Sequence, residues 1–265
     1  MRGSRPRYGQ HFLKSPRTIA RIIDAVGAAE GSTVVEIGPG RGALTRELLD
    51  RGLRVLAFEI DARLAGLLRE SLAERSLFLV EGDALHADIG AALENIDATL
   101  PVPLVGNLPY ESATPMLRAF VRRPDLFSRI VTMVQKEVAE RLLSPPGGDA
   151  YGYLSLDVGA HATARRLFDV SRGEFEPPPE VQSMVIELVP HAAAPGTVEA
   201  LKVASAGFTL RRKTLINALT PLWGREQAQR AVAEAGHPPT VRAETLGLPA
   251  FLALAPLLGP PAQRQ

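Results

Sequence analysis

The segment Gly106-Asn107-Leu108-Pro109-Tyr110 combines groups that suit chemistry on a purine amine. Such a nitrogen is a poor nucleophile because its lone pair is delocalised into the ring. The side-chain carbonyl of Asn107 and the backbone carbonyl of Leu108 can each accept one of its hydrogens, and Pro109 fixes the backbone direction. Tyr110 offers a flat ring for base stacking. The pattern predicts catalysis by positioning; the alternative is an ordinary Asn-x-Pro loop with a packed tyrosine.

A glycine-rich turn predicts a binding site for a second reactant. An apolar strand runs into Gly38, Gly40 and Gly42 and then into a helical pattern. The spacing departs from the dinucleotide fingerprint, and the lysine of a phosphate loop is missing. With Glu36 beside the turn, a neutral or cationic nucleoside suits it better than a pyrophosphate. Taken alone, the pattern also fits a plain tight turn.

Two acidic residues follow the next strands. Glu59 ends the second strand, 19 residues after Gly40, and Asp83 follows the third. An acid at the first position can accept from both ribose hydroxyls, and Asp83 from an adenine amino group. Each acid alone could be a solvated loop residue or a helix N-cap. Together with the glycine turn they predict an S-adenosylmethionine pocket at the carboxyl edge of a sheet.

The segment from Phe175 to Pro179 is rigid and extended because it holds three consecutive prolines. It has two interpretations. The segment braces the last strand of the sheet, or it holds Phe175 over the second face of the target base.

Strand and helix patterns alternate through most of the chain, which predicts an α/β fold with a parallel sheet covered on both faces. Strands are expected at 33–37, 54–60, 77–81, 102–106 and 129–135, and helices at 18–26, 43–51, 62–74 and 116–121. Apolar segments at 154–162, 166–170 and 184–189 complete the pattern. After an Ala/Pro-rich linker at 190–196, only helical patterns remain, at 197–206, 208–222, 225–235 and within 241–258. We therefore expect a catalytic domain over 1–190 and a small helical domain over 191–265.

Composition excludes several classes of chemistry. The chain of 265 residues has no cysteine, which excludes disulfides, thiolate zinc sites and iron–sulfur clusters. Its five histidines are scattered, so no metal is expected. No apolar run reaches the roughly 18 residues of a membrane span. The basic N-terminus lacks the apolar core of a signal peptide, so a cytoplasmic protein without membrane contact is expected.

Positive charge collects at the two ends of the chain. Residues 1–23 carry six basic and no acidic residues, and 191–265 carry eight basic and four acidic ones. Since the whole chain has a net charge of +1, the stretch 24–190 carries −9. Ordinary charge scatter is one interpretation; the other is that both ends grip a polyanion such as RNA.

In combination these motifs resemble the ribosomal RNA adenine dimethyltransferase family that acts near the 3′ end of small-subunit rRNA. The similarity covers nearly the whole chain. Residues 9–13 resemble its cofactor-lid motif, with His11 where Asn is common, and Asn107 to Tyr110 its catalytic motif. In 175–183, Glu180 and Gln182 replace the usual Lys and Asp. Further similar segments are 135–142, 151–155 and 211–214.

The resemblance implies S-adenosylmethionine contacts at His11, Leu13, Gly38, Gly40, Glu59, Asp83 and Asn107. It implies a Rossmann-like class I methyltransferase sheet with a final antiparallel strand. A basic helical segment with Arg211, Arg212 and Lys213 would contact RNA. The implied reaction adds two methyl groups to each of two adjacent adenines in a terminal hairpin loop. The implied partner is small-subunit rRNA within a 30S precursor particle, and we expect a monomer.

Three other functions share parts of this pattern. A macrolide-resistance methyltransferase acts on large-subunit rRNA, and its motif usually has Ile where Leu108 stands. A non-catalytic RNA-binding or transcription factor could use the same fold, but every cofactor and catalytic position is present here. A methyltransferase acting on protein glutamine has a related motif, and the two basic ends argue against it.

Overall fold

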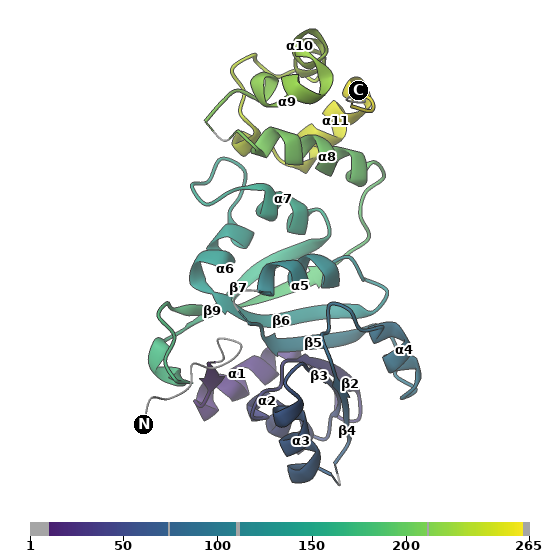
Figure 1. Cartoon of the computed structure of the whole chain (residues 1–265), viewed down its shortest axis with the longest axis vertical. Coiled ribbons are helices and arrows are strands. Elements are labelled where there is room, and N and C mark those ends of the chain that lie inside the picture. Colours follow the sequence, from purple (N-terminus) through teal and green to yellow (C-terminus); the bar gives the residue numbers. More distant parts are fainter. Residues whose placement is uncertain (1–10, 74, 110–111, 211, 262–265) are drawn as a thin grey trace. The chain divides into compact units, whose positions relative to one another are not determined.

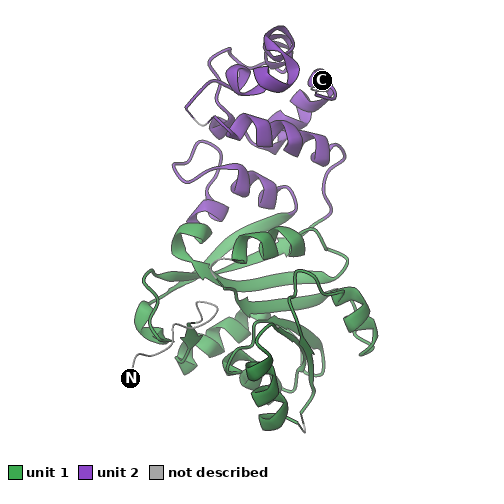
Figure 2. Cartoon of the chain, in the orientation of Figure 1, with its two compact units in different colours: residues 1–139, 162–191 green, residues 140–161, 192–265 purple. Residues whose placement is uncertain are grey.

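The computed structural model describes residues 11–73, 75–109, 112–210 and 212–261. The chain forms two compact units, shown in Figure 2: unit 1 is Met1–Ala139 with Ala162–His191, and unit 2 is Glu140–His161 with Ala192–Gln265. The expected boundary between residues 190 and 191 lies one residue before the border between His191 and Ala192. The membership of Glu140–His161 in the helical unit was not predicted, because its helical pattern looks like one more crossover of the sheet.

Unit 1 is built on a seven-stranded sheet with the order β4-β3-β2-β5-β6-β9-β7. Strands β2 to β6 are parallel, and β9 runs antiparallel to both of its neighbours, as predicted. The chain moves outward from β2 to β3 and β4 and then returns to β5, so the order reverses between β2 and β5. Open α/β sheets bind ligands at such a point. The bounds are β2 (Thr33–Ile37), β3 (Arg54–Glu59), β4 (Leu77–Glu81), β5 (Val102–Asn107), β6 (Phe127–Gln135), β7 (Ala162–Val170) and β9 (Ser183–Pro190).

Helices cover both faces of this sheet, and this burial explains why the central strands are mostly apolar and do not alternate with polar residues. All five residues of β2 are buried. Helices α1 (Pro16–Val26), α2 (Ala43–Asp50) and α3 (Ala62–Ser71) pack on one face around a shared apolar cluster. Helix α5 (Ala113–Phe120) lies on the other side of the strands (Figure 1), and α4 (Ile89–Glu94) precedes β5. Ser15, Asp61 and Asp88 begin α1, α3 and α4 as side-chain N-caps.

A second sheet of two very short strands joins distant parts of unit 1. Strand β1 (Phe12–Leu13) pairs antiparallel with β8 (Phe175–Glu176). Lys14 extends the pairing, since its backbone N–H donates to the carbonyl of Glu174 at 2.9 Å. Strands of two residues carry no periodic signal, so the sequence did not predict this sheet.

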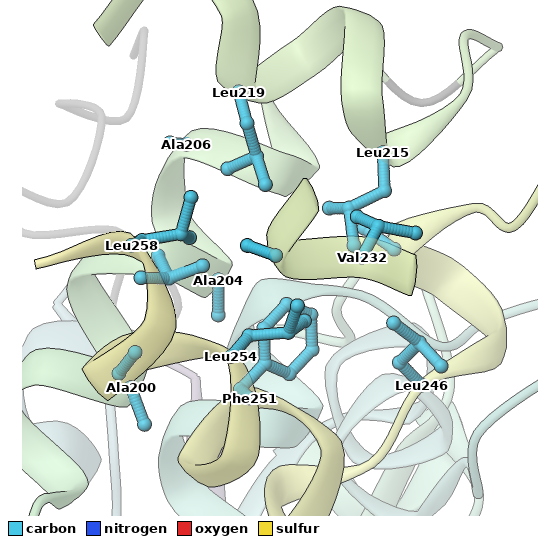
Figure 3. Close-up of a cluster of buried hydrophobic side chains, with 14 of the residues drawn as sticks. Ala200, Ala204, Ala206, Leu215, Leu219, Val232, Leu246, Phe251, Leu254 and Leu258 are labelled. Atoms are coloured by element: carbon cyan, nitrogen blue, oxygen red, sulfur yellow. The ribbon is translucent and has the colours of Figure 1, made fainter. Parts of the chain in front are cut away.

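Unit 2 is helical and has its own apolar core. It comprises the second half of α6 (Lys136–Leu143), then α7 (Tyr153–Gly159), α8 (Thr197–Phe208), α9 (Leu215–Trp223), α10 (Arg225–Glu234) and α11 (Leu248–Leu258). Figure 3 shows Leu215, Leu219, Phe251 and Leu254 converging in this core. The buried Tyr151 hydroxyl donates to the carbonyl of Leu246 at 2.9 Å and so ties the segment before α7 to the C-terminal helices. In the described part of the chain, every helix is too short or too polar to traverse a bilayer.

One predicted helix, 208–222, has the wrong bounds. The expected helix 208–222 is interrupted, because α8 ends at Phe208 and α9 begins at Leu215. The Thr214 side chain accepts a hydrogen bond from the backbone N–H of Asn217 and thus starts a new helix. Arg212 and Lys213 therefore lie in a loop and not on a helix, and Arg211 lies outside the described residues.

Candidate active site

A cavity of about 320 Å³ lies at the carboxyl edge of the sheet, at the point where the strand order reverses. Its walls come from β1 and from the segments that follow β2, β3, β4 and β5. Of the residues predicted from the sequence, those that line it are His11, Leu13, Gly38, Gly40, Glu59, Asp83, Asn107, Leu108 and Pro109. Tyr110 lies outside the described residues.

Glu59 is held in one orientation at the end of β3. Its side chain is buried, with 2% of the residue exposed. One carboxylate oxygen accepts the backbone N–H of Gly40 at 2.9 Å, and the other accepts the N–H of Asp61 at 2.9 Å. Each carboxylate oxygen has a second lone pair for a ligand. The carboxylate is thus preorganised to accept two further hydrogen bonds from a diol.

Asp83 stands at the corresponding place after β4. One of its oxygens accepts the backbone N–H of Leu85 at 2.9 Å, while the other lies 3.8 Å from His86 Nε2. Its side chain is about one-third exposed, less firmly enclosed than that of Glu59. Since it lines the same cavity, it can accept from a ligand amino group.

The glycine turn brings β1 close to the loop after β2. Gly40 has φ of +58°, a conformation that favours glycine. A Cβ atom there would also lie 3.1 Å from the Phe12 ring. The Arg41 guanidinium carbon also lies over the Phe12 ring, 4.4 Å from its centroid. Gly40 therefore serves two purposes: the turn itself, and the close approach of the strand that closes the cavity.

Glu36 is a buried acid in the cavity wall. Burial raises its pKa to about 7; the nearby polar groups of Thr45 oppose the rise, and the negative charge of Glu59 adds to it. Its Oε2 atom makes no hydrogen bond with the described residues, although only 1% of the residue is exposed. A buried oxygen without a partner is costly unless a ligand or water satisfies it. The sequence pattern singled out Glu36 only as unfavourable to phosphate.

Asn107 is the last residue of β5, and its amide is oriented by the strand that closes the cavity. Its Nδ2 donates to the backbone carbonyl of His11 at 3.0 Å. A carbonyl can only accept, so the amide nitrogen faces His11 and Oδ1 is left to accept from another group. Gly106, the residue before it, allows β5 to pack closely on β2, because a Cβ there would lie 2.7 Å from the carbonyl oxygen of Ile37.

The backbone after Asn107 is equally constrained. The N–H of Leu108 donates to the carbonyl of Met133 at 3.3 Å, and the Leu108 side chain is buried. The hydroxyl of Thr132 donates to the carbonyl of Gly106 at 3.0 Å. These contacts fix the strand end on which two carbonyl acceptors are predicted.

Phe175 does not line the cavity. Its ring is fully buried with Leu13, Val170 and Val185 in the cluster beneath α1, and its backbone pairs with Leu13. A ring with 0% exposure is not available for stacking on a base. The stacking interpretation is therefore wrong for this structure, and the bracing interpretation agrees with it: Phe175 supports β1.

His11 connects the segment after β8 with the catalytic motif through two hydrogen-bond contacts. Its ring Nδ1 lies 2.8 Å from the carbonyl of Pro177, and its own carbonyl holds Asn107. The histidine is thus accommodated where the family commonly has Asn. Cavity residues that sequence reasoning did not assign include Phe12, Arg41, Ser112 and Met116. Only the neighbouring glycines could have drawn attention to the first two.

The chain matches the family described as ribosomal RNA adenine dimethylase over residues 1–245. It belongs to the ribosomal RNA adenine dimethylase family. A protein of Thermosynechococcus vestitus named ribosomal RNA small subunit methyltransferase A is 41% identical, with 96% of this chain and 97% of that protein covered. A protein of the same name from Pseudomonas aeruginosa is 40% identical over 95% of this chain and 93% of its own length.

Two solved structures share the fold of this chain. A dimethyladenosine transferase from Plasmodium falciparum has the same fold, with a TM-score of 0.72 at 24% identity, covering 92% of this chain and 96% of its own. The 23S rRNA methyltransferase ErmE has a TM-score of 0.68 at 26% identity, covering 93% and 99%. The predictions of the family, of the class I methyltransferase fold and of an S-adenosylmethionine-dependent rRNA methyltransferase are confirmed.

The cavity of this dimethylase fits S-adenosylmethionine in the chemistry of its walls. Three carboxylates, Glu36, Glu59 and Asp83, suit hydroxyl, amino and cationic groups and would repel a phosphate. The unpartnered Oε2 of Glu36 points to a ligand that donates hydrogen bonds or carries positive charge. No group of three or more metal-ligating side chains occurs among the described residues.

Proposed function

We propose that this chain transfers methyl groups to the N6 amino groups of two adjacent adenines in the 3′-terminal hairpin loop of small-subunit rRNA, two methyls to each. The observation that carries the proposal is the placement of Asn107, Leu108 and Pro109 on the wall of the cavity that holds Glu59 and Asp83. Relatives at about 40% identity, named for the small subunit, support the choice of RNA.

In the proposed mechanism, Asn107 Oδ1 and the Leu108 carbonyl accept the two hydrogens of the adenine amine. The nitrogen is thereby held toward tetrahedral geometry, with its lone pair directed into the cavity. The Asn107–His11 hydrogen bond keeps Oδ1 facing the amine. Tyr110, by its place in the motif, would stack on the target base. No strong base is needed, because the amine becomes acidic only as its new bond forms; catalysis is mostly alignment.

S-adenosylmethionine supplies an electrophilic methyl group when bound. We propose that Glu59 accepts from its ribose hydroxyls and Asp83 from its adenine amine. Gly38, Gly40, His11, Leu13 and Asn107 would line the methionine side. This assignment uses the acceptor capacity that the backbone contacts of Glu59 and Asp83 leave open.

We further propose that residues 1–190 carry catalysis and that 191–265 contact RNA, with Arg211, Arg212 and Lys213 as phosphate contacts. Arg212 and Lys213 are exposed in the α8–α9 loop. A monomer acting in the cytoplasm on a 30S precursor particle completes the proposal. The charge of residues 191–265, with eight basic against four acidic residues, supports their contact with RNA.

A second candidate substrate is large-subunit rRNA, favoured by the likeness to ErmE at 26% identity. The test offers 30S precursors and 23S RNA in one reaction with methyl-labelled S-adenosylmethionine. We expect label in 16S RNA alone. Label in 23S RNA alone would replace the proposal with the second candidate, and label in neither would reject both.

A further inference from the structure

Unit 1 carries a basic surface outside the cavity, formed by Lys14, Arg17 and Arg21 around α1 and by Arg165 on β7. We call it the α1–β7 surface. All four side chains are exposed. Lys14 follows directly on the strand Phe12–Leu13, whose residues line the cavity. The surface therefore starts at the cavity rim and continues along the helix.

Helix α1 presents its two arginines on one side. Thr18, Ile22, Ile23 and Val26 are its buried residues, which pack toward the sheet. Arg17 and Arg21 are four residues apart and so lie on the opposite, solvent-facing side. Within the described part of the chain, neither takes part in an ion pair.

The position of these charges is unfavourable for the helix itself. The N-terminal turn of a helix favours acidic residues by roughly 0.3–1 kcal/mol each and disfavours cations by a similar amount. Helix α1 has no acid in its first turn, while Arg17 lies within it and Lys14 just before it. The Glu174 carboxylate, which accepts a hydrogen bond from the Thr18 hydroxyl, offsets part of this positive charge. The cations that remain favour an external anion.

Arg21 is fixed in place by an aromatic ring. Its guanidinium carbon lies 3.7 Å from the centroid of the Phe168 ring, a stacked cation–π contact. Stacking occupies one flat face of the guanidinium and leaves its N–H edges to solvent. This geometry suits bidentate contact with a phosphate.

Arg165 lies beside this contact on β7. Arg165 pairs with Glu187 and Phe168 with Val185, two residues of β9 that share a face, so Arg165 and Phe168 are neighbours on the α1 side. The buried Glu187 carboxylate is shared by Arg129, at 3.0 Å, and Arg165. Two guanidinium groups on one carboxylate leave one net positive charge. Arg165 keeps 63% of its side chain exposed.

We propose that the α1–β7 surface binds phosphate groups of the RNA that contains the target adenines. The proposal rests on the proposed function for the identity of that RNA. Lys14, Arg17 and Arg21 belong to residues 1–23, which hold six basic and no acidic residues, whereas residues 24–190 have a net charge of −9. A polyanion is the partner that such a local contrast selects. The α1–β7 surface would hold the RNA strand that leads to the cavity.

The test compares two double variants of the full chain. Arg17→Gln with Arg21→Gln removes two charges from the surface; Arg63→Gln with Arg69→Gln removes two exposed charges from α3 as a matched control. Binding to deproteinised small-subunit rRNA is measured over a range of KCl concentrations. We expect the first variant to bind about threefold to thirtyfold more weakly. Its logarithmic salt slope should be shallower by about 1.4–1.8.

Three further readouts isolate the surface. Affinity for S-adenosylmethionine, thermal unfolding and the methylation rate at saturating RNA should match the parent for both variants. Because Arg21 also packs on Phe168, Arg17→Gln alone provides a variant without that contact; about half the change in slope is expected from it.

Two results would overturn the proposal. The first is an RNA affinity and salt slope equal to those of the parent or of the α3 control. The second is unchanged binding of naked rRNA with weaker binding of protein-containing particles, which would assign the surface to a protein. Product analysis of the parent keeps the proposed function separate: methyl groups found elsewhere, with RNA binding still dependent on Arg17 and Arg21, would overturn the function and leave the surface.

Discussion

The cavity and the basic α8–α9 loop of this protein are built in opposite ways. In the cavity, each functional group is held by the backbone: Glu59 by two N–H groups, and Asn107 by the carbonyl of His11. In the α8–α9 loop, Arg212 and Lys213 are exposed. Aligning a weak nucleophile demands placement to a fraction of an ångström. Attracting a polyanion demands charge in the right region.

This difference predicts how changes in the two regions behave. A change in the cavity should give a large effect on one step, with little dependence on salt. A change in a basic segment should give a small effect on RNA affinity that disappears at high salt. The following variants test that contrast, beginning with the largest effect.

Asn107→Ala should lower the rate of methyl transfer by about a hundredfold to a thousandfold, because one aligned transition-state hydrogen bond contributes about 2.7–4 kcal/mol. RNA affinity should change little. The measurement is single-turnover methylation at saturating cofactor and RNA, with Asn95→Ala at the exposed end of α4 as the control. Turnover of Asn107→Ala at the parent rate would show that the motif is only a structural loop.

Glu36→Gln should change how stability depends on pH. The pKa of Glu36 is raised from 4.5 to about 7 in the folded protein. The folded protein therefore keeps its full stability below pH 4.5, where Glu36 is protonated in both states, and loses stability as the pH rises through 7. The loss is on the order of 3 kcal/mol. Gln does not ionise, so the variant should gain stability relative to the parent between pH 5 and 8. Urea unfolding at both pH values measures this; parallel pH profiles would contradict it.

Glu59→Gln should weaken S-adenosylmethionine binding by about tenfold to a hundredfold, since charge-assisted hydrogen bonds contribute about 1.5–3 kcal/mol. Both carboxylate oxygens already face backbone N–H donors, so the Gln NH₂ group would oppose one of them. Calorimetry gives the affinity. Glu81→Gln, on the neighbouring strand but outside the cavity wall, is the matched control; equal affinities for both variants would reject the assignment of Glu59.

Arg212→Gln with Lys213→Gln should have the smallest effect, a loss of about twofold to tenfold in RNA affinity. The salt slope should be shallower by about 1–2. Cofactor affinity should not change. Arg225→Gln with Arg230→Gln on α10 removes the same charge from the same unit. A slope identical to that of the parent would remove the loop from the RNA interface.

The sequence predicted the cavity better than the basic segments, for a physical reason. Strand ends with glycine and acid carry local signals, and the predicted strands 33–37 and 77–81 coincide with β2 and β4. The cofactor-contact residues implied by the resemblance all line one cavity. The helix expected at 208–222 failed, because the N-cap at Thr214 overrides a continuous apolar pattern.

Features that depend on contacts between distant segments were out of reach. Leu13 and Phe175 are far apart in the sequence but pair in the second sheet, and this pairing buries the Phe175 ring. The hydrogen bond from Asn107 to His11 spans 96 positions. The orphaned oxygen of Glu36 is visible only once burial is known. No local periodicity encodes these relations.

The central claim is that this chain dimethylates two adjacent adenines of small-subunit rRNA. Mass spectrometry of RNA fragments tests it most directly, after 30S precursors are incubated with the purified chain and S-adenosylmethionine. The account predicts one fragment near the 3′ end that gains four methyl groups, with N6,N6-dimethyladenosine as the modified nucleoside. Over the time in which the parent completes the reaction, Asn107→Ala should leave most of that fragment unmodified. Parent enzyme that leaves the fragment unchanged, or that modifies another base, would contradict the account.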